Sequence, residues 1–253
     1  MLKLLSCCCF TMMSMVLMVT PGYTAEEAGT NSLKILVYGA SGKVGTHVVD
    51  EALNRGHRVT AVSRDPARIT KTHDKLTVVQ GDILDTESIS SLATGQDVII
   101  ISVRGVVGKT KDPANTVPRI GVEKVVNVLR ELEGDAPRLI HVGGAGSLEV
   151  KPGVLYADKL PKIILPKKLE LEIAGQVLAL QYLKTVNDVS WSYATPPKNF
   201  TNGKRTGVFR IGGSQLLENS HGRSRISRAD FAVALIDEAE NDEHTMQQFS
   251  IVY

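Results

Sequence analysis

The chain alternates short runs of aliphatic and β-branched residues with longer stretches in which apolar positions recur every three or four residues. The short runs predict strands at 33–38, 58–62, 76–80, 97–103, 138–142 and 191–194. The longer stretches predict a helix that ends at 54–56 and further helices at 118–131, 169–184 and 227–240. Strands that are apolar on both faces are typical of a parallel sheet covered by helices. The pattern therefore predicts an α/β fold of Rossmann type, in which a doubly wound parallel sheet forms a single domain.

The N-terminal segment follows a different pattern. Lys3 is its only charge before Glu26, residues 10–19 are apolar or nearly so, and a proline and small residues follow. This order is typical of a secretory signal. We therefore predict a signal peptide over 1–25, a domain over 32–253, and a secreted or periplasmic protein. Two alternatives stay open: an over-assigned start codon, which leaves the protein cytoplasmic, and an uncleaved leader that anchors it to a membrane.

Composition removes several classes of function. All three cysteines lie at 7–9, so the domain has no thiolate nucleophile, disulfide or cysteine–metal site. A net charge of +2 and 5% aromatic residues argue against nucleic-acid binding. The histidines show no metal-ligand spacing, so no metal is expected. No stretch after the leader is long and apolar enough for a stable membrane span. The expected partner is a small-molecule substrate, and the expected state is a monomer or dimer.

A glycine-rich turn, GASGKVG at 39–45, lies directly between the first strand and the first helix. Gly39 lets the chain turn sharply, Gly42 lets the backbone approach a pyrophosphate, and Gly45 lets helix and strand pack closely. The free amides and the dipole of the helix start favour anionic phosphates. Lys43 either reaches a phosphate or is solvated. The predicted phosphate loop is completed by Ser41, Lys43 and Val44.

Two further positions bear on the nucleotide. Arg64 follows the second strand, where it could pair with a 2′-phosphate and stack on adenine, so we predict NADP rather than NAD. Asp65, one position later than the acidic residue of an NAD site, is the counter-argument. After the third strand, Asp82 either accepts a hydrogen bond from the adenine amino group or caps a turn. Ile83, beside it, is expected to contact the cofactor.

With these motifs the chain resembles an atypical member of the short-chain dehydrogenase/reductase superfamily. It is most similar to the NmrA-like and flavin-reductase or biliverdin-reductase-like NAD(P)-binding proteins, in particular to candidate NADH-flavin reductases and epimerase-like proteins. The resemblance covers 33–253 and implies a nicotinamide near Ser102, Val103 and the Gly143–Gly144 turn. The matching segments are 39–45, 63–66, 81–82, 142–148, 188–197 and 225–227.

The catalytic end departs from the superfamily, whose chemistry needs a Tyr and a Lys four residues apart on a helix and a Ser after the fifth strand. Here Tyr156 is followed by Lys159 at i+3, between prolines that make a helix doubtful. Tyr182 has Lys184 at i+2, on a different helical face. Gly143 stands where the Ser is expected, which predicts room for a flat ring. No catalytic residue is assigned.

Because a flavin or quinone can take its proton from solvent, the sequence favours an NAD(P)H-dependent oxidoreductase that passes hydride to such a planar acceptor. Two alternatives remain. One is a non-catalytic NAD(P)-binding sensor of NmrA type, which the missing acid–base pair favours. The other is an epimerase-like enzyme, whose transient oxidation needs that pair most.

Other polar residues have an ordinary interpretation beside a functional one. His141, within the fifth strand, is expected to be a core histidine rather than a catalytic one. Arg104 faces either an anionic substrate or water. His47 and His57 flank the first helix and are expected on the surface, and 195–226 is expected to be irregular and to form part of the substrate rim. A solvated basic cluster is expected at Lys162, Lys167 and Lys168.

Overall fold

The computed structural model describes residues 32–161 and 163–253, so the predicted signal peptide and Lys162 lie outside the described residues. A central sheet has the strand order β10-β12-β8-β5-β4-β1-β2-β3, and every neighbouring pair is parallel except β10 with β12. Its strands are β1 (Lys34–Tyr38), β2 (Arg58–Ser63), β3 (Leu76–Gln80), β4 (Val98–Ile101), β5 (Arg138–Val142), β8 (Trp191–Thr195), β10 (Arg210–Gly212) and β12 (Gln247–Val252).

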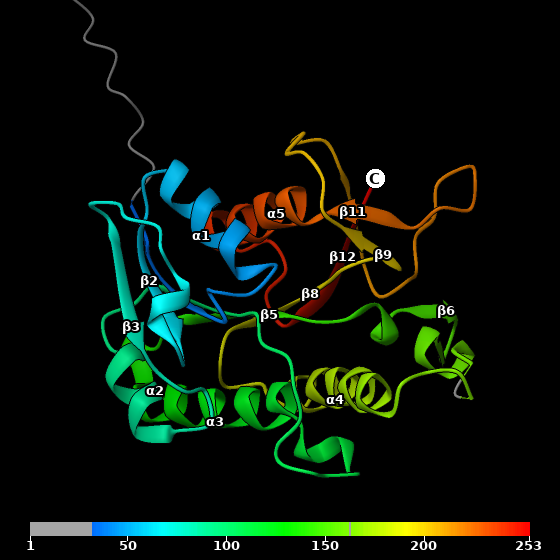
Figure 1. Ribbon diagram of the computed structural model, residues 1–253, viewed down its shortest axis with the longest axis horizontal. Coiled ribbons are helices and arrows are strands. Elements are labelled where there is room, and N and C mark those ends of the chain that lie inside the picture. The colour runs from blue at the N-terminus through cyan, green and yellow to red at the C-terminus, as the bar shows by residue number, and fades with distance from the viewer. Residues whose placement is uncertain (1–31, 162) are drawn as a thin grey trace, which may run out of the picture. The chain divides into compact units, whose positions relative to one another are not determined.

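Helices cover both faces of the sheet, as Figure 1 shows. One face carries α1 and α5, and the other carries α2, α3 and α4. The α-helices of the described residues are α1 (Gly45–Asn54), α2 (Thr86–Ala93), α3 (Val117–Glu131), α4 (Lys167–Leu183) and α5 (Arg228–Asn241). The predicted Rossmann-type architecture is therefore confirmed, and the sheet with its two helical layers forms one domain.

The first strand explains why the sheet needs both layers. Successive side chains of a strand point to opposite faces. Ile35 and Val37 pack with α1 and α5, whereas Leu36 and Tyr38 pack with the other three helices. All four are buried. A strand with no polar side is stable only when both faces are covered, as the apolar pattern predicted.

Helix α2 and strand β12 are among the elements that were not predicted from the sequence. Helix α2 has only eight residues, and only Ile89 and Ala93 of them are buried, so its apolar stripe is too short to be read. Strand β12 alternates polar residues with Phe249 and Ile251 and lies beside β8, where it closes the parallel part of the sheet.

The segment at 195–226, expected to be irregular, is only partly so. It contributes β10 to the main sheet, and β9 (Asn199–Thr201) pairs in parallel with β11 (Arg225–Ser227). Shorter elements elsewhere are the hairpin of β6 (Glu149–Lys151) with β7 (Val154–Leu155) and single 3-10 turns. The turns are η1 (Pro66–Arg68), η2 (Pro113–Asn115), η3 (Glu133–Asp135), η4 (Ala145–Ser147) and η5 (Tyr156–Lys159).

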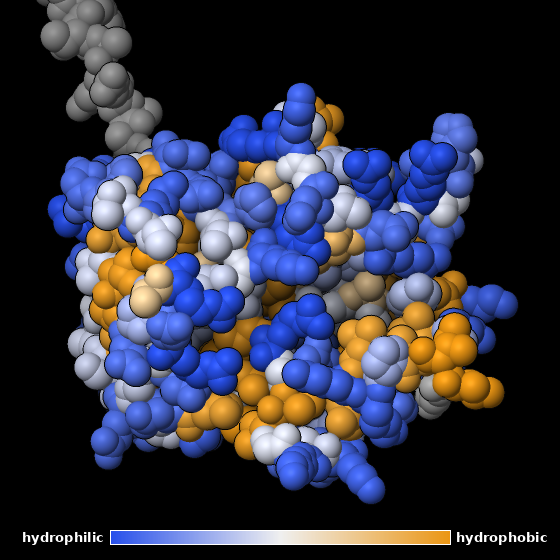
Figure 2. Space-filling model, in the orientation of Figure 1, coloured by the Kyte–Doolittle hydropathy of each residue, from blue (hydrophilic) through white to orange (hydrophobic). Residues whose placement is uncertain are grey.

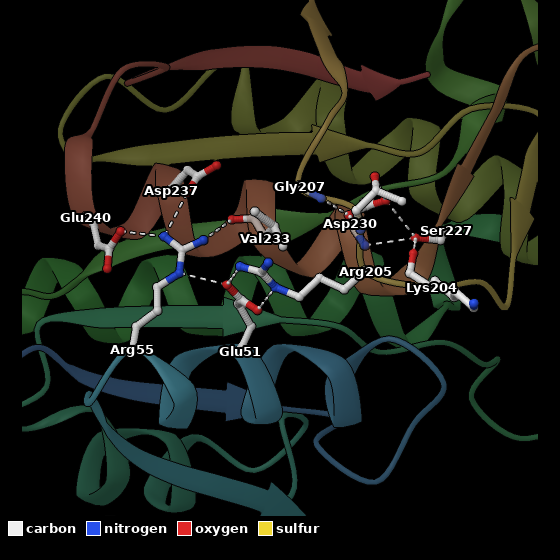
Figure 3. A network of polar contacts seen from close by, with 11 residues as sticks. Glu51, Arg55, Lys204, Arg205, Gly207, Ser227, Asp230, Val233, Asp237 and Glu240 are labelled. Carbon is white, nitrogen blue, oxygen red and sulfur yellow. Dashed lines mark hydrogen bonds and ion pairs between the residues drawn. The ribbon is translucent and has the colours of Figure 1, made fainter.

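A charge network joins α1, α5 and the loop before β10 (Figure 3). Glu51 on α1 receives Arg55 Nε at 2.8 Å and Arg205 Nε at 2.7 Å. Arg55 also bonds Asp237 and Glu240 on α5, at 2.7 and 2.6 Å. The Glu51 side chain is only 5% exposed, so these bonds replace the contacts with water that its carboxylate loses on burial. The network therefore fastens two helices and a long loop together.

His57, expected on the surface, is instead completely buried. Its Nδ1 accepts a hydrogen bond from Leu33 N at 3.2 Å, so Nε2 carries the proton and donates to Glu240 at 2.9 Å. The chain turns back from α1 into β2 at this point, which places the ring beneath the start of β1. Both ring nitrogens are satisfied, so burial carries no unpaired polar group.

Within residues 32–161 and 163–253, no helix has the length and apolar content needed to cross a membrane. In the same residues, no three His, Cys, Asp or Glu side chains are grouped as metal ligands.

Candidate functional site

A cleft of about 540 Å³ opens beyond the carboxyl ends of β1, β2, β3 and β4. Strand order reverses between β1 and β4, and ligands of doubly wound sheets bind at such a switch point. The cleft is lined by Tyr38, Gly39, Ser41, Gly42, Val62, Ser63, Arg64, Asp65, Arg68, Gly81, Asp82, Ile83, Leu84, Ser102, Val103, Arg104 and Val117.

The glycine loop is packed too tightly for any side chain at two of its positions. Gly39 has a φ of +78°, and a Cβ there would lie 2.2 Å from the carbonyl oxygen of Ser102. A Cβ on Gly45 would lie 2.2 Å from the carbonyl oxygen of Gly39. Gly42 N donates to that same carbonyl at 2.9 Å and closes the turn. The loop therefore has the shape that the sequence motif predicts.

The N-terminus of α1 is not capped by the protein. Val44 occupies the cap position, no side chain accepts a bond there, and the first turn has no acidic residue. The starts of α3 and α4 also lack a side-chain cap, whereas Asp85 caps α2 and Ser227 caps α5. The free amides and the positive end of the α1 dipole face the glycine loop, an arrangement suited to a phosphate.

Two arginines line the cleft beyond β2. Arg64 follows the strand, and Arg68, which the sequence analysis missed, ends the 3-10 turn η1. Both are exposed, and neither guanidinium makes an ion pair or hydrogen bond within the described residues. Ser63 Oγ donates to the Asp65 carbonyl at 2.9 Å and accepts from Asp65 N at 3.2 Å, which fixes the turn that carries them. The spacing of i to i+4 could have indicated Arg68 as a partner of Arg64.

Asp82 lies in a tight turn before α2. Its Oδ1 accepts from Leu84 N at 3.0 Å, which supports the turn interpretation, while its place in the cleft lining leaves the adenine interpretation open. Nearby, the Tyr38 hydroxyl is buried and has no hydrogen-bond partner in the described residues. Burial raises the pKa of this hydroxyl, and the carboxylates of Asp82 and Asp85 raise it further. Tyr38 therefore keeps a neutral, unpaired hydroxyl buried behind the cleft lining.

At the other end of the cleft, Ser102 and Val103 follow β4 and line it as expected, but Gly143 does not. A Cβ on Gly143 would lie 2.1 Å from Cε1 of the Tyr193 ring. The expectation that this glycine leaves room for a flat ring is therefore wrong, because Tyr193 already fills the space.

The tyrosines considered as catalytic lie away from the cleft lining. Tyr156 begins the 3-10 turn η5, so no α-helix follows it, and Lys198 Nζ lies 5.2 Å from the centre of its ring. Tyr182 is near the end of α4, with the Arg119 guanidinium 4.5 Å from its ring centre. The face of α4 toward β4 and β5 carries Glu172 instead, whose carboxylate bonds Arg104.

His141 is completely buried in β5, as expected of a core histidine. Its Nε2 lies 2.9 Å from Gln176 Oε1, and its ring stacks on Tyr193 with a centroid distance of 5.2 Å. The Tyr193 hydroxyl donates to the Gln176 carbonyl at 2.8 Å. Burial lowers the pKa of His141 to about 4, so the ring is neutral at physiological pH.

The structure brings most of the predicted cofactor residues together. Those that line the cleft are Gly39, Ser41, Gly42, Arg64, Asp82, Ile83, Ser102 and Val103. Those outside its lining are Lys43, Val44, Gly45 and Gly143. No residue of the expected rim at 195–226 lines it. Sequence reasoning missed Tyr38, Val62, Arg68, Leu84 and Val117, most of which are apolar positions that read equally well as core.

Comparison with known proteins shows the family to which the chain belongs. A family model described as NAD(P)H-binding matches residues 39–242. The chain belongs to this NAD(P)H-binding family. The Bacillus subtilis protein YwnB is 30% identical to this NAD(P)H-binding chain over 230 residues, which cover 87% of the chain and 98% of YwnB.

Solved structures extend the comparison to the fold. A candidate epimerase from Bacteroides thetaiotaomicron is 29% identical to this NAD(P)H-binding protein, with a TM-score of 0.77 over 88% of this chain and 97% of its own. A candidate NADH-flavin reductase from Streptococcus pneumoniae is 28% identical, with a TM-score of 0.72 over 87% and 99%. A candidate exported protein from Burkholderia pseudomallei is 31% identical, with a TM-score of 0.73 over 87% and 100%. The resemblance to the atypical dehydrogenase/reductase group fits these neighbours.

Proposed function

We propose that the protein is an NADPH-dependent oxidoreductase that reduces a planar acceptor such as a flavin or a quinone. The observation that carries the proposal is the pairing, in one cleft, of an uncapped helix start with two unpaired arginines. The helix start suits a pyrophosphate, and the arginines suit the additional 2′-phosphate of NADP. Asp65, exposed between them, is the feature that an NAD site would use.

The residues of the cleft fit such a cofactor along its whole length. The amide of Ser41 and the uncapped start of α1 would hold the pyrophosphate, and Arg64 and Arg68 the 2′-phosphate. The lining at Asp82, Ile83 and Leu84 would receive the adenosine. When bound, the nicotinamide supplies a hydride.

The acceptor follows from the acid–base groups near Ser102 and Val103. Neither Tyr156 nor Tyr182 lines the cleft, and Arg104, which does, is paired with the carboxylate of Glu172. Carbonyl reduction needs a positioned proton donor. A flavin or quinone does not, because its ring heteroatoms exchange protons with water. This comparison supports a planar acceptor, and the candidate NADH-flavin reductase among the structural neighbours agrees with it.

Nucleotide titration tests the cofactor. We expect NADPH to bind more tightly than NADH and to raise the Tm by mass action. Arg64→Ala and Arg68→Ala should each weaken NADPH about tenfold or more while leaving NADH unchanged, because each removes a charge-assisted bond. Arg58→Ala is the matched control, since Arg58 is exposed at the opposite end of β2. Equal affinities for the two nucleotides would contradict the NADP assignment.

Stopped-flow oxidation of NADPH with FMN, riboflavin or menadione tests the acceptor. Turnover with at least one of them is expected. Binding of NADPH without turnover of any planar acceptor would overturn the proposal and favour the sensor of NmrA type. Loss of label from a tritiated sugar nucleotide, rather than NADPH oxidation, would favour the epimerase.

We also propose that the N-terminal segment exports the protein. Its support is the charge and apolar order of residues 1–25, together with the candidate exported protein among the relatives. Fusion of 1–31 to a phosphatase that is active only after export should give activity. Lys3→Glu with two aspartates in the apolar core should abolish it, and retained activity would contradict the proposal.

A further inference from the structure

Exposed apolar side chains gather in one segment of the domain. The large apolar residues that are exposed in the described part of the chain are Val107, Ile163, Ile164, Leu169, Val208, Ile211 and Met246. Three of these seven lie between η5 and the first turn of α4. Ile163 is 100% exposed and Ile164 78% exposed, so both point into solvent at neighbouring positions. Side chains of this size are seldom left so exposed without a partner.

The same segment is strongly basic. Residues 159–169 read KLPKIILPKKL, with four lysines and no acidic residue. Lys159, Lys167 and Lys168 are exposed. The acidic residues at its two ends are engaged: Asp158 accepts from Leu155 N at 3.1 Å, and Glu170 pairs with Lys167 at 2.9 Å. The 159–169 segment therefore presents two exposed isoleucines between exposed lysines, Lys159 before them and Lys168 after them.

An apolar groove of about 240 Å³ adjoins the segment. Leu160 and Leu165 form one wall, and Ile173 and Val177 of α4 form the other. Figure 2 shows hydrophobic surface gathered at the right edge of this face, in the region where Figure 1 places β6 and the approach to α4. The apolar surface therefore continues from the exposed isoleucines onto the body of the domain.

We propose that the 159–169 segment docks on the surface of an anionic lipid bilayer. Ile163 and Ile164 enter the boundary between head groups and acyl chains, while the lysines pair with lipid phosphates and their stems lie along apolar surface. Charge favours lipid over a second copy of the chain as the occupant. In a pair of identical chains joined through this segment, lysines would face lysines and repel one another, whereas an anionic lipid surface attracts the lysines. The predicted leader would also bring the chain to a membrane, where an anionic lipid surface is present.

Residues 32–253 are the form to test, because the leader could bind lipid by itself. This region folds alone in the relatives, since it corresponds to 97–100% of the solved chains described above. We expect it to sediment with vesicles of equimolar phosphatidylcholine and phosphatidylglycerol, and not with phosphatidylcholine alone. Each lysine at the surface should strengthen binding about fivefold, and high salt should release the protein.

The variant I163D/I164D should bind at least tenfold more weakly, because it removes two apolar side chains from the lipid boundary. K159S/K168S should lose about 25-fold. Both should keep the wild-type Tm, since these side chains are exposed. V208D, which alters an exposed valine elsewhere, is the matched control and should bind as wild type does.

Three results would overturn the proposal: no sedimentation with anionic vesicles, equal binding by I163D/I164D and the wild type, or equal loss in V208D. Sedimentation velocity tests the alternative that a second copy of the chain, rather than lipid, covers this segment. A wild-type dimer that I163D/I164D converts to a monomer, without vesicle binding, would assign the segment to contact between copies. The proposal is independent of the oxidoreductase activity, because no step uses NADPH.

Discussion

Arg104, which follows β4, directs both Nε and Nη2 at a single carboxylate oxygen of Glu172 on α4, at 3.0 and 2.5 Å. The arginine side chain is 72% exposed and lines the cleft, whereas the glutamate is only 11% exposed. The pair bridges the two elements that flank the expected nicotinamide end. The carboxylate of Glu172 also neutralises the positive charge that Arg104 could offer to an anionic acceptor at this end of the cleft.

Glu172→Gln should therefore release a cation at the cleft without altering side-chain volume. We predict that the KM for FMN, which carries a phosphate, falls about fivefold relative to that for neutral riboflavin, because an exposed pair is worth up to about 1 kcal/mol. The double variant E172Q/R104A should lose this preference. An unchanged ratio of the two KM values would contradict the prediction, and steady-state kinetics with both acceptors measures it.

Gly143 and Gly144 offer a second test at adjacent positions. A Cβ on Gly143 would meet the Tyr193 ring at 2.1 Å, whereas one on Gly144 would lie 3.7 Å from Gln176. Gly143→Ser, which restores the residue typical of the superfamily, should lower the free energy of unfolding by about 1–3 kcal/mol through overpacking. Gly144→Ala should stay close to wild type. Urea unfolding measures both, and equal stability of the two variants would contradict the packing argument.

The phosphate end of the site could be predicted because its determinants are contiguous. Gly39, Gly42 and Gly45 act through backbone space within one turn, and that requirement is visible in seven residues of sequence. Arg64 could be placed because it follows a strand whose end was readable. The fold was predictable for the same reason, since most strands of the sheet are contiguous apolar runs and each long helix carries its own period.

The acceptor end could not be predicted, because its shape depends on distant residues. Tyr193, on β8, fills the space above Gly143, and Glu172, on α4, neutralises Arg104. Neither contact can be predicted from the residues next to it in the sequence. His57 shows the same limit: a polar residue in a turn is expected at the surface, but Glu240 on α5 and the Leu33 amide make its burial favourable.

His141 should make stability depend on pH over a defined range. Its pKa is 6.5 in an unfolded chain and about 4 in the fold, mainly through burial. A proton therefore favours the unfolded chain, so this contribution is complete above pH 6.5 and is lost as the pH falls to 4, by about 3 kcal/mol. His141→Asn should flatten the curve in this range, and His221→Asn, at the surface, is the control. Urea unfolding across the range is the measurement, and an unchanged slope in His141→Asn would contradict the assignment.

Glu51 should control stability at lower pH. The Arg205 guanidinium, with Arg55 behind it, holds the pKa of Glu51 below its ordinary 4.5 despite the opposing effect of burial. The ionised form is therefore favoured by folding, so the contribution is present above pH 4.5 and is lost as the pH falls through the lower folded value.

Glu51→Gln should cost about 2 kcal/mol at neutral pH, because bonds to a charged acceptor become bonds to a neutral one. It should also remove part of the acid dependence below pH 4.5. Glu131→Gln, which changes an exposed glutamate without an ion pair in the described residues, is the control. Because Arg205 is bonded to α1 through Glu51, the loop at 202–209 should also become more sensitive to proteolysis in Glu51→Gln. A stable variant whose loop resists protease as wild type does would mean that Asp230, which bonds Thr206 and Gly207, holds the loop instead.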